Sequence, residues 1–146
     1  SVSDVQVAVT INQNCTNAQI LTFMWRAMGR PEPSNTANPY ANIKAEDYFY
    51  KAVLWAREKG MLSGSTFDPN APCTRASTVT YLWKLAGSPA AQGGGFSDVP
   101  ASAAYAQAVA WAVSKQITNG TSPTTFSPGD TCTRGQIMTF LYRDLV

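Results

Sequence analysis

The sequence predicts a mainly helical fold built from helix–loop–helix repeats, and three observations lead to this prediction. The cysteines Cys15, Cys73 and Cys132 lie 58 and 59 residues apart, and each is followed by a threonine. Between them, apolar residues recur with the period of an α-helix. A Phe-x-Pro tripeptide at 67–69 and again at 126–128 interrupts the helical pattern, because proline cannot continue a helix. A period held through three copies indicates an internal repeat.

We interpret residues 1–146 as a single domain, because 45% of them are hydrophobic and the chain can bury roughly two-thirds of its unfolded surface. Residues 1–30 would hold an N-terminal strand and a partial repeat. A second repeat is expected over 39–87 and a third over 96–146. The chain begins with Ser1 rather than Met, so we expect that a leader was removed or that the sequence was trimmed.

Composition excludes several classes of function. The net charge is only +2 and no basic block is present, which argues against a nucleic-acid-binding arm. No apolar run approaches the roughly 20 residues that a membrane-spanning helix needs. The sequence has no histidine, the commonest general base and metal ligand, and no acidic pair recurs in one constellation. We therefore predict a protein that is not an enzyme and that uses no cofactor and no metal.

The first repeat begins with a predicted strand instead of a helix. Val5, Val7, Val9 and Ile11 alternate with polar residues, which is typical of a β-strand. We expect this short strand to pack over the apolar stripe of the helix that follows at 16–29.

A helix is predicted after each Cys-Thr pair. Each would begin with a threonine N-cap and carry Gln or Ser three residues later, which is the spacing of a capping box. The pairs are Thr16 with Gln19, Thr74 with Ser77, and Thr133 with Gln136. The expected core stripes are Leu21, Met24 and Met28; Val79, Leu82 and Ala86; and Met138, Leu141 and Leu145.

The second and third repeats each carry an additional helix before the Phe-x-Pro segment. Apolar residues at i, i+3, i+4 and i+7 predict these helices over 47–59 and 104–115. Gly60 is placed to end the first of them as a left-handed cap, and Gln116 stands at the equivalent position of the second. The linkers between repeats, rich in Pro, Gly, Ser and Asn, are 31–38 and 88–95.

Aromatic residues recur at equivalent positions. Trp25, Trp83 and Tyr142 form one set, and Trp55 and Trp111 form another. Sugars stack on exposed aromatic rings, but an aromatic residue repeated in helical register more often packs between helices. We therefore interpret both sets as packing residues.

The cysteines are interpreted as buried, unpaired small hydrophobic residues. Their odd number leaves at least one without an intramolecular partner, and a single disulfide or an intermolecular pair stays open. Three thiolates without histidine would make a poor zinc site.

An ordered series of motifs resembles the surface-layer homology (SLH) repeat. In the third repeat these motifs are 96–100, 108–112, 117–120, 126–128 and 133–136. A slightly more divergent copy runs from Tyr40 through Leu85, and the resemblance covers about residues 14–146. It implies a pseudo-threefold bundle of helices whose grooves between repeats bind secondary cell-wall polysaccharide. The first copy is incomplete, because it lacks the first helix of the repeat.

The resemblance also implies which residues contact the ligand. In that family a Thr-Arg pair at the start of the second helix supplies groove contacts, which here falls on Thr74 with Arg75 and on Thr133 with Arg134. The first copy departs from this pattern, since Asn17 stands where the others have arginine, and Asn17 is the candidate sugar contact of that copy.

The chemistry of these positions can be argued independently of the family. A helix N-terminus leaves backbone N–H groups unpaired and carries partial positive charge. A guanidinium added there suits a carboxylate or phosphate, such as ketal-linked pyruvate on an acidic wall glycan. Alternatively, the arginines pair with a nearby acid. The candidate acids are Asp68, Asp98 and Asp130.

Two glycine turns are further candidates for sugar contacts. Ser63-Gly64 and Asn119-Gly120 could present backbone N–H groups to sugar hydroxyls, although such pairs often form turns alone.

We predict a non-catalytic module that binds an acidic cell-wall glycan and attaches a protein to the outside of a bacterial cell. The alternative is a structural subunit of a self-assembling extracellular layer or filament. It is motivated by the missing first helix, which would leave apolar surface exposed on the helix at 16–29.

Overall fold

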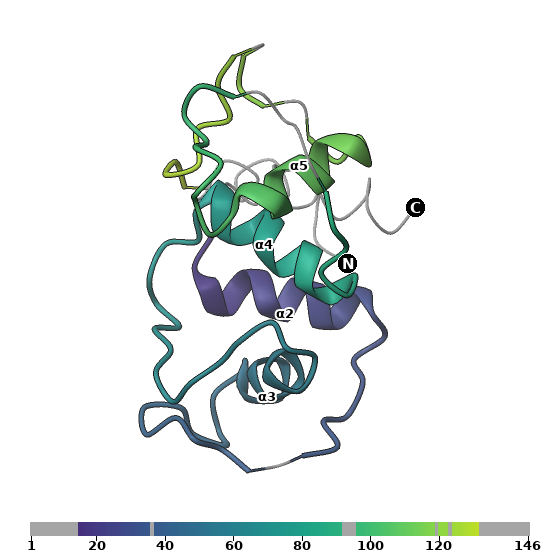
Figure 1. The fold of residues 1–146 in the computed structure, drawn as a ribbon. Coiled ribbons are helices and arrows are strands. Elements are labelled where there is room, and N and C mark those ends of the chain that lie inside the picture. Colours follow the sequence, from purple (N-terminus) through teal and green to yellow (C-terminus); the bar gives the residue numbers. More distant parts are fainter. Residues whose placement is uncertain (1–14, 36, 92–95, 119, 123, 132–146) are drawn as a thin grey trace, which may run out of the picture. The chain divides into compact units, whose positions relative to one another are not determined.

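The computed structural model describes residues 15–35, 37–91, 96–118, 120–122 and 124–131. This part of the chain forms the helices α2 (Asn17–Ala27), α3 (Tyr50–Glu58), α4 (Arg75–Leu85) and α5 (Ala106–Ser114) (Figure 1). Within these ranges no β-strand forms, and the extended segments include an isolated antiparallel bridge between Thr74 and Thr131. The predicted helical fold class is therefore confirmed.

The chain divides into two compact units, which are described separately. One comprises Thr16–Ala71, in which α2 packs against α3. The other comprises Ser1–Cys15 with Pro72–Val146, in which α4 packs against α5. Each unit thus joins the second helix of one repeat to the first helix of the next, so its core crosses the repeat boundary.

The threonine caps form as the sequence predicts. Thr16 Oγ1 accepts the N–H of Gln19 at 3.2 Å, and Gln19 Oε1 accepts the N–H of Thr16 at 2.9 Å, which completes a capping box. At the start of α4, Thr74 Oγ1 accepts the N–H of Ser77 at 3.0 Å. These bonds fix where α2 and α4 begin.

The helices α3 and α5 begin later than the apolar pattern predicts. The residues before α3 form turns instead, with the N–H of Tyr50 bonded to the carbonyl of Asp47 at 3.0 Å. Neither helix has a side-chain cap. Both are followed by a left-handed residue, which is Gly60 as predicted, at φ 79°, and Gln116 at φ 60°.

The tryptophans pack and bond as structural residues. The indole N–H groups of Trp25 and Trp83 donate to the carbonyls of Pro31 and Pro89, each at 2.8 Å, where the chain leaves α2 and α4. Trp55 and Trp111 are buried. The packing interpretation is therefore supported, and Tyr142 lies outside the described residues.

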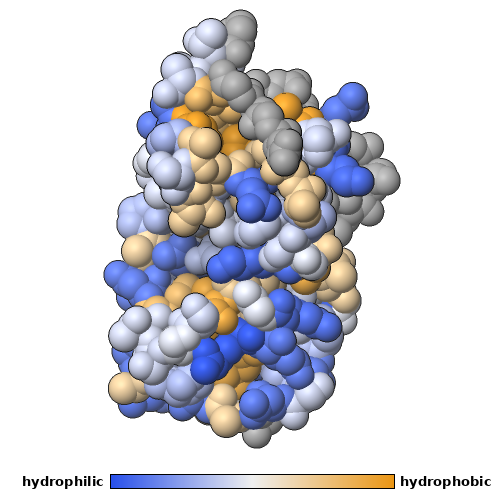
Figure 2. All heavy atoms as spheres, viewed as in Figure 1, coloured by the Kyte–Doolittle hydropathy of each residue, from blue (hydrophilic) through white to orange (hydrophobic). Residues whose placement is uncertain are grey.

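The apolar stripe predicted on the first helix is mostly covered. Leu21 and Met24 of α2 are fully buried, and only Met28 at the helix end is exposed, at 46%. On the face drawn in Figure 2, apolar residues appear in several separate areas rather than on one continuous surface. The uncovered helix face that motivated the self-assembly alternative is therefore absent from α2 as described.

Two of the three cysteines are described, and both are buried. The N–H of Cys73 donates to the carbonyl of Cys15 at 2.8 Å, and Cys73 Sγ lies 3.3 Å from Thr78 Oγ1. Cys132, the strand predicted at 5–11 and the helix predicted after Thr133 lie outside the described residues. Those predictions stay untested.

Candidate functional site

The loop that follows α5 docks on the start of α4 through backbone hydrogen bonds. The N–H groups of Arg75 and Ala76 donate to the carbonyls of Asp130 at 2.8 Å and Pro128 at 3.1 Å. With Ser77 N–H bonded to the Thr74 side chain, the first three N–H groups of α4 already have partners. The expectation that these groups are available to an anion is therefore wrong for α4.

The other unit repeats this docking at the start of α2. The N–H groups of Asn17 and Ala18 donate to the carbonyls of Ala71 at 2.9 Å and Pro69 at 3.0 Å. The Phe-x-Pro segment therefore serves to cap the following helix. Proline suits this role, since it has no N–H of its own to satisfy.

The side chain of Arg75 is buried, with 5% exposure. Its Nε–H donates to the carbonyl of Phe126 at 2.8 Å, and its Cζ lies 4.7 Å from the centroid of the Phe126 ring. Its Nη2 donates to Thr118 Oγ1 at 3.4 Å, and that oxygen also accepts the N–H of Gly120 at 3.2 Å. Arg75 thus ties the helix start to the glycine turn through one threonine hydroxyl.

The carboxylate of Asp98 binds the N–H groups of the segment whose carbonyl, at Phe126, is bound by Arg75. Its carboxylate oxygens accept the N–H of Phe126 at 2.9 Å and that of Ser127 at 2.7 Å. The hydrogen bond from Phe126 is the main cause that lowers the pKa of Asp98 below its ordinary value. The bond from Ser127 and the positive charge of Arg75 act on this pKa in the same direction, while burial opposes them. Among the acids considered as partners for arginine, Asp98 is held on the same residue as Arg75, because both side chains bond to the backbone of Phe126.

The turn at Gly120 is tightly packed. Its φ is 86°, and a Cβ there would lie 2.6 Å from both Phe96 Cε1 and the carbonyl oxygen of Thr125. Glycine is required here for both reasons. Its predicted partner Asn119 is outside the described residues, as are Thr133 and Arg134.

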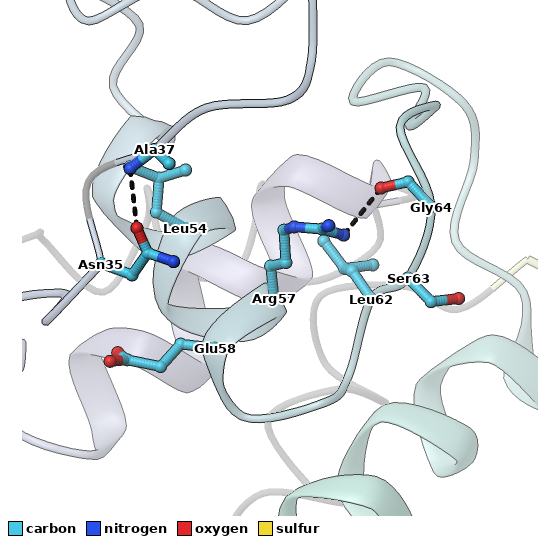
Figure 3. A pocket seen from close by; sticks show the side chains of 8 residues that line it. All are labelled: Asn35, Ala37, Leu54, Arg57, Glu58, Leu62, Ser63 and Gly64. Carbon is cyan, nitrogen blue, oxygen red and sulfur yellow. Dashed lines mark hydrogen bonds between the residues drawn. The ribbon is translucent and has the colours of Figure 1, made fainter.

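In the unit Thr16–Ala71 the residues predicted to contact sugar, Asn17, Ser63 and Gly64, do not lie in one site. The Asn17 side chain donates to the carbonyl of Asp68 at 3.2 Å on the surface. Ser63 and Gly64 instead line a pocket of about 340 Å³, to which Asn17 does not contribute (Figure 3). The residues that complete the pocket are Asn35, Ala37, Leu54, Arg57, Glu58 and Leu62.

Sequence reasoning missed the charged residues of this pocket. The guanidinium of Arg57 donates through Nη1 to the carbonyl of Gly64 at 2.7 Å, and its Cζ lies 5.8 Å from the centroid of the Tyr40 ring. Glu58 accepts the N–H of Ser34 at 3.1 Å through one carboxylate oxygen. The signal available in the sequence was a difference between repeats, because Val113 stands in the third repeat where the second has Arg57.

A second, more apolar pocket of about 230 Å³ lies in the unit that contains α4 and α5. It includes the rings of Tyr81, Trp83 and Tyr105. Because sugar rings stack on aromatic faces, this pocket could supply a stacking surface beside α4.

Neither a cluster of metal ligands nor a membrane-spanning helix is present in the described ranges. No group of three or more Cys, Asp or Glu side chains there is arranged to hold a metal ion. None of the helices described has the length and apolar character needed to cross a membrane.

Comparison with known proteins identifies the repeats. The family model for the S-layer homology domain matches residues 41–78 and 95–138. A comparison with curated proteins finds no match. The two matched segments span more than half of the chain and contain the docking loops described above. The chain therefore belongs to the S-layer homology family, whose non-catalytic domains anchor proteins at the cell surface by binding cell-wall polysaccharide.

Proposed function

We propose that this chain holds an extracellular protein on a bacterial cell wall by binding an acidic wall glycan beside the Thr-Arg helix starts, without catalysis. The observation that carries the proposal is the shared hydroxyl of Thr118, which accepts hydrogen bonds from both Arg75 and Gly120. This hydroxyl links Arg75, the arginine of the Thr-Arg motif, to the Gly120 turn, which is expected to contact sugars. The family match to both repeats supplies the ligand class.

In this proposal Arg75 acts as a buried positive charge that also positions the turn. Because its side chain is shielded from solvent, its field is screened less than that of a surface lysine. An acidic substituent of the glycan beside Gly120 would be attracted by that charge, while the carboxylate of Asp98, whose hydrogen bonds to Phe126 and Ser127 hold it in place, would partly offset the attraction. Thr74 contributes by capping α4, which keeps Arg75 at the first helical position.

The surface beside Gly120 is rich in hydroxyl groups, which supports a sugar ligand. Thr121 Oγ1 lies 2.7 Å from Ser127 Oγ, and Ser122 Oγ lies 2.6 Å from Thr125 Oγ1. Hydroxyls both donate and accept, so they match the hydroxyls of a sugar ring. In the third repeat we propose that Thr133 caps the helix and Arg134 supplies the positive charge, as Thr74 and Arg75 do in the second. We propose that Asn119 contacts the sugar beside Gly120.

The test is binding of purified wall polysaccharide to the whole chain, measured by calorimetry well below the melting temperature of every variant. We expect Arg75→Ala and Arg134→Ala each to weaken binding at least tenfold. Arg75→Lys should retain part of the affinity, because it keeps the charge. Asn17→Ala is the matched control, since it changes the same position in the copy without arginine. Unchanged affinity in the double variant R75A/R134A would overturn the proposal.

The same preparation also tests self-assembly. We expect monomers by sedimentation in the absence of glycan, because the described apolar stripe of α2 is covered. Concentration-dependent large oligomers would instead favour the structural-subunit alternative.

A further inference from the structure

We infer that the unit Thr16–Ala71 carries its own sugar subsite, built on Arg57 of α3 rather than on the Asn17 position. The inference rests on the proposed glycan-binding function and assigns a second place where the same polymer is held. In the described part of each unit a glycine turn follows one helix, with Gly64 after α3 and Gly120 after α5.

Each unit places one guanidinium against an aromatic pair. Phe96 and Phe126 form the pair in one unit, with ring centroids 5.8 Å apart, and Arg75 lies over Phe126. Tyr40 and Phe67 form the pair in the other, with centroids 6.1 Å apart. There the guanidinium over the first ring is that of Arg57. The guanidinium of this unit thus comes from the last turn of α3 and lies over Tyr40, the counterpart of Phe96, rather than over the counterpart of Phe126.

The two guanidinium groups differ in accessibility. Arg75 is buried, and Phe96 fills the space at Gly120. Arg57 is only half-buried and borders the pocket, and a Cβ at Gly64 would meet nothing within 4 Å. The Gly120 turn is therefore closely packed, whereas the Gly64 turn leaves space beside it.

The groups that line the pocket complement sugar hydroxyls. In Figure 3, Arg57 extends toward Gly64, while Asn35 and Glu58 lie on the other side of the pocket. Asn35 Oδ1 accepts the N–H of Ala37 at 3.0 Å, which orients its side-chain amide. The guanidinium and the amide can donate hydrogen bonds, whereas the carboxylate and the hydroxyl of Ser63 can accept them.

Size and charge narrow the class of ligand. A volume of about 340 Å³ is at the lower end of ligand pockets, roughly 300–1,000 Å³, and suits one or two sugar units. Arg57 and Glu58 carry opposite charges, so the pocket has no net attraction for an anion. We therefore assign it to an uncharged sugar unit of the wall glycan, distinct from the acidic unit proposed for the Gly120 turn.

The test separates wall-polysaccharide fragments into uncharged and acidic fractions by anion exchange and titrates each into the ¹⁵N-labelled whole chain. We expect the uncharged fraction to shift the backbone amide signals of Ser63 and Gly64 and the Nε–H signal of Arg57. Arg57→Met, which keeps the apolar stem, should lose at least tenfold in affinity for that fraction. Lys59→Met is the matched control, since it removes the same charge outside the pocket.

Each outcome decides the inference. Binding that leaves the Ser63 and Gly64 signals unmoved overturns this subsite alone, as does wild-type affinity in R57M. Shifts at Gly64 with the acidic fraction only overturn the assignment to an uncharged unit. Absence of binding by any fraction overturns the proposed function as well. Because the titration of the wild-type chain reads the Ser63 and Gly64 signals directly, it tests the subsite even if R57M does not fold.

Discussion

Arg75→Ala should destabilise the protein strongly, although arginine is usually a surface residue. The substitution removes the hydrogen bond from Nε to the carbonyl of Phe126 and the contact with the Phe126 ring. It also leaves that carbonyl without the bond in a region that water reaches poorly.

The magnitude follows from these contacts. A hydrogen bond to a charged group contributes about 1.5–3 kcal/mol. A desolvated cation–π contact contributes about 2 kcal/mol. Both hold the same residue, so their effects overlap, and the bond to Thr118 at 3.4 Å adds little. We expect a loss of about 3 kcal/mol. At about 2–4 °C per kcal/mol for a chain of this size, Tm should fall by roughly 6–12 °C.

The assay is thermal unfolding followed by circular dichroism, with urea unfolding to obtain the free energy. Asn17→Ala is the matched control, because it removes only an exposed side-chain bond to Asp68 at the equivalent helix start. It should cost about 0.5 kcal/mol or less. Equal losses of stability in the two variants would refute the clamp role of Arg75.

Three further predictions concern the same two units. Gly120→Ala should lower the free energy of unfolding in urea by about 3–4 kcal/mol, because it adds left-handed strain and overpacking. Gly64→Ala should lower it by only about 1–2 kcal/mol, because its Cβ meets no atoms within 4 Å. Similar losses in the two variants would contradict the difference in packing between the turns. Because the pKa of Asp98 is lower in the folded than in the unfolded state, its stabilising effect is present above its ordinary pKa of 3.8 and is lost as pH falls below that value. Thermal unfolding of Asp98→Asn should therefore show a smaller loss of Tm between pH 7 and pH 3 than the wild type. Parallel curves of Tm against pH for the two proteins would argue against a stabilising role of ionised Asp98. Tyr40→Phe should leave the free energy of unfolding unchanged or raise it by about 1 kcal/mol, because the hydroxyl is buried without a hydrogen-bond partner in the described structure; a clear loss in urea unfolding would show that this hydroxyl is bonded.

The repeat, the helices and their caps could be predicted from the residues alone. The Thr16–Gln19 capping box, the left-handed cap at Gly60 and the packing role of the tryptophans all follow from sequence patterns. These features depend on interactions between residues a few positions apart, and the recurrence of the repeat made each pattern visible more than once. The motif order also identified the family, and with it the class of ligand.

Which of the candidate residues are accessible depended on tertiary packing. Arg75 reaches Phe126 across 51 positions of sequence and becomes buried, while the backbone N–H groups beside it are bonded to the docking loop. Arg57 was not a candidate, because a charged residue near a helix end is ordinarily a solvated one. Its place beside Gly64 depends on how α3, the turn and Tyr40 pack together. Local patterns specify where a helix begins, but the exposure of a side chain is set by every segment packed around it.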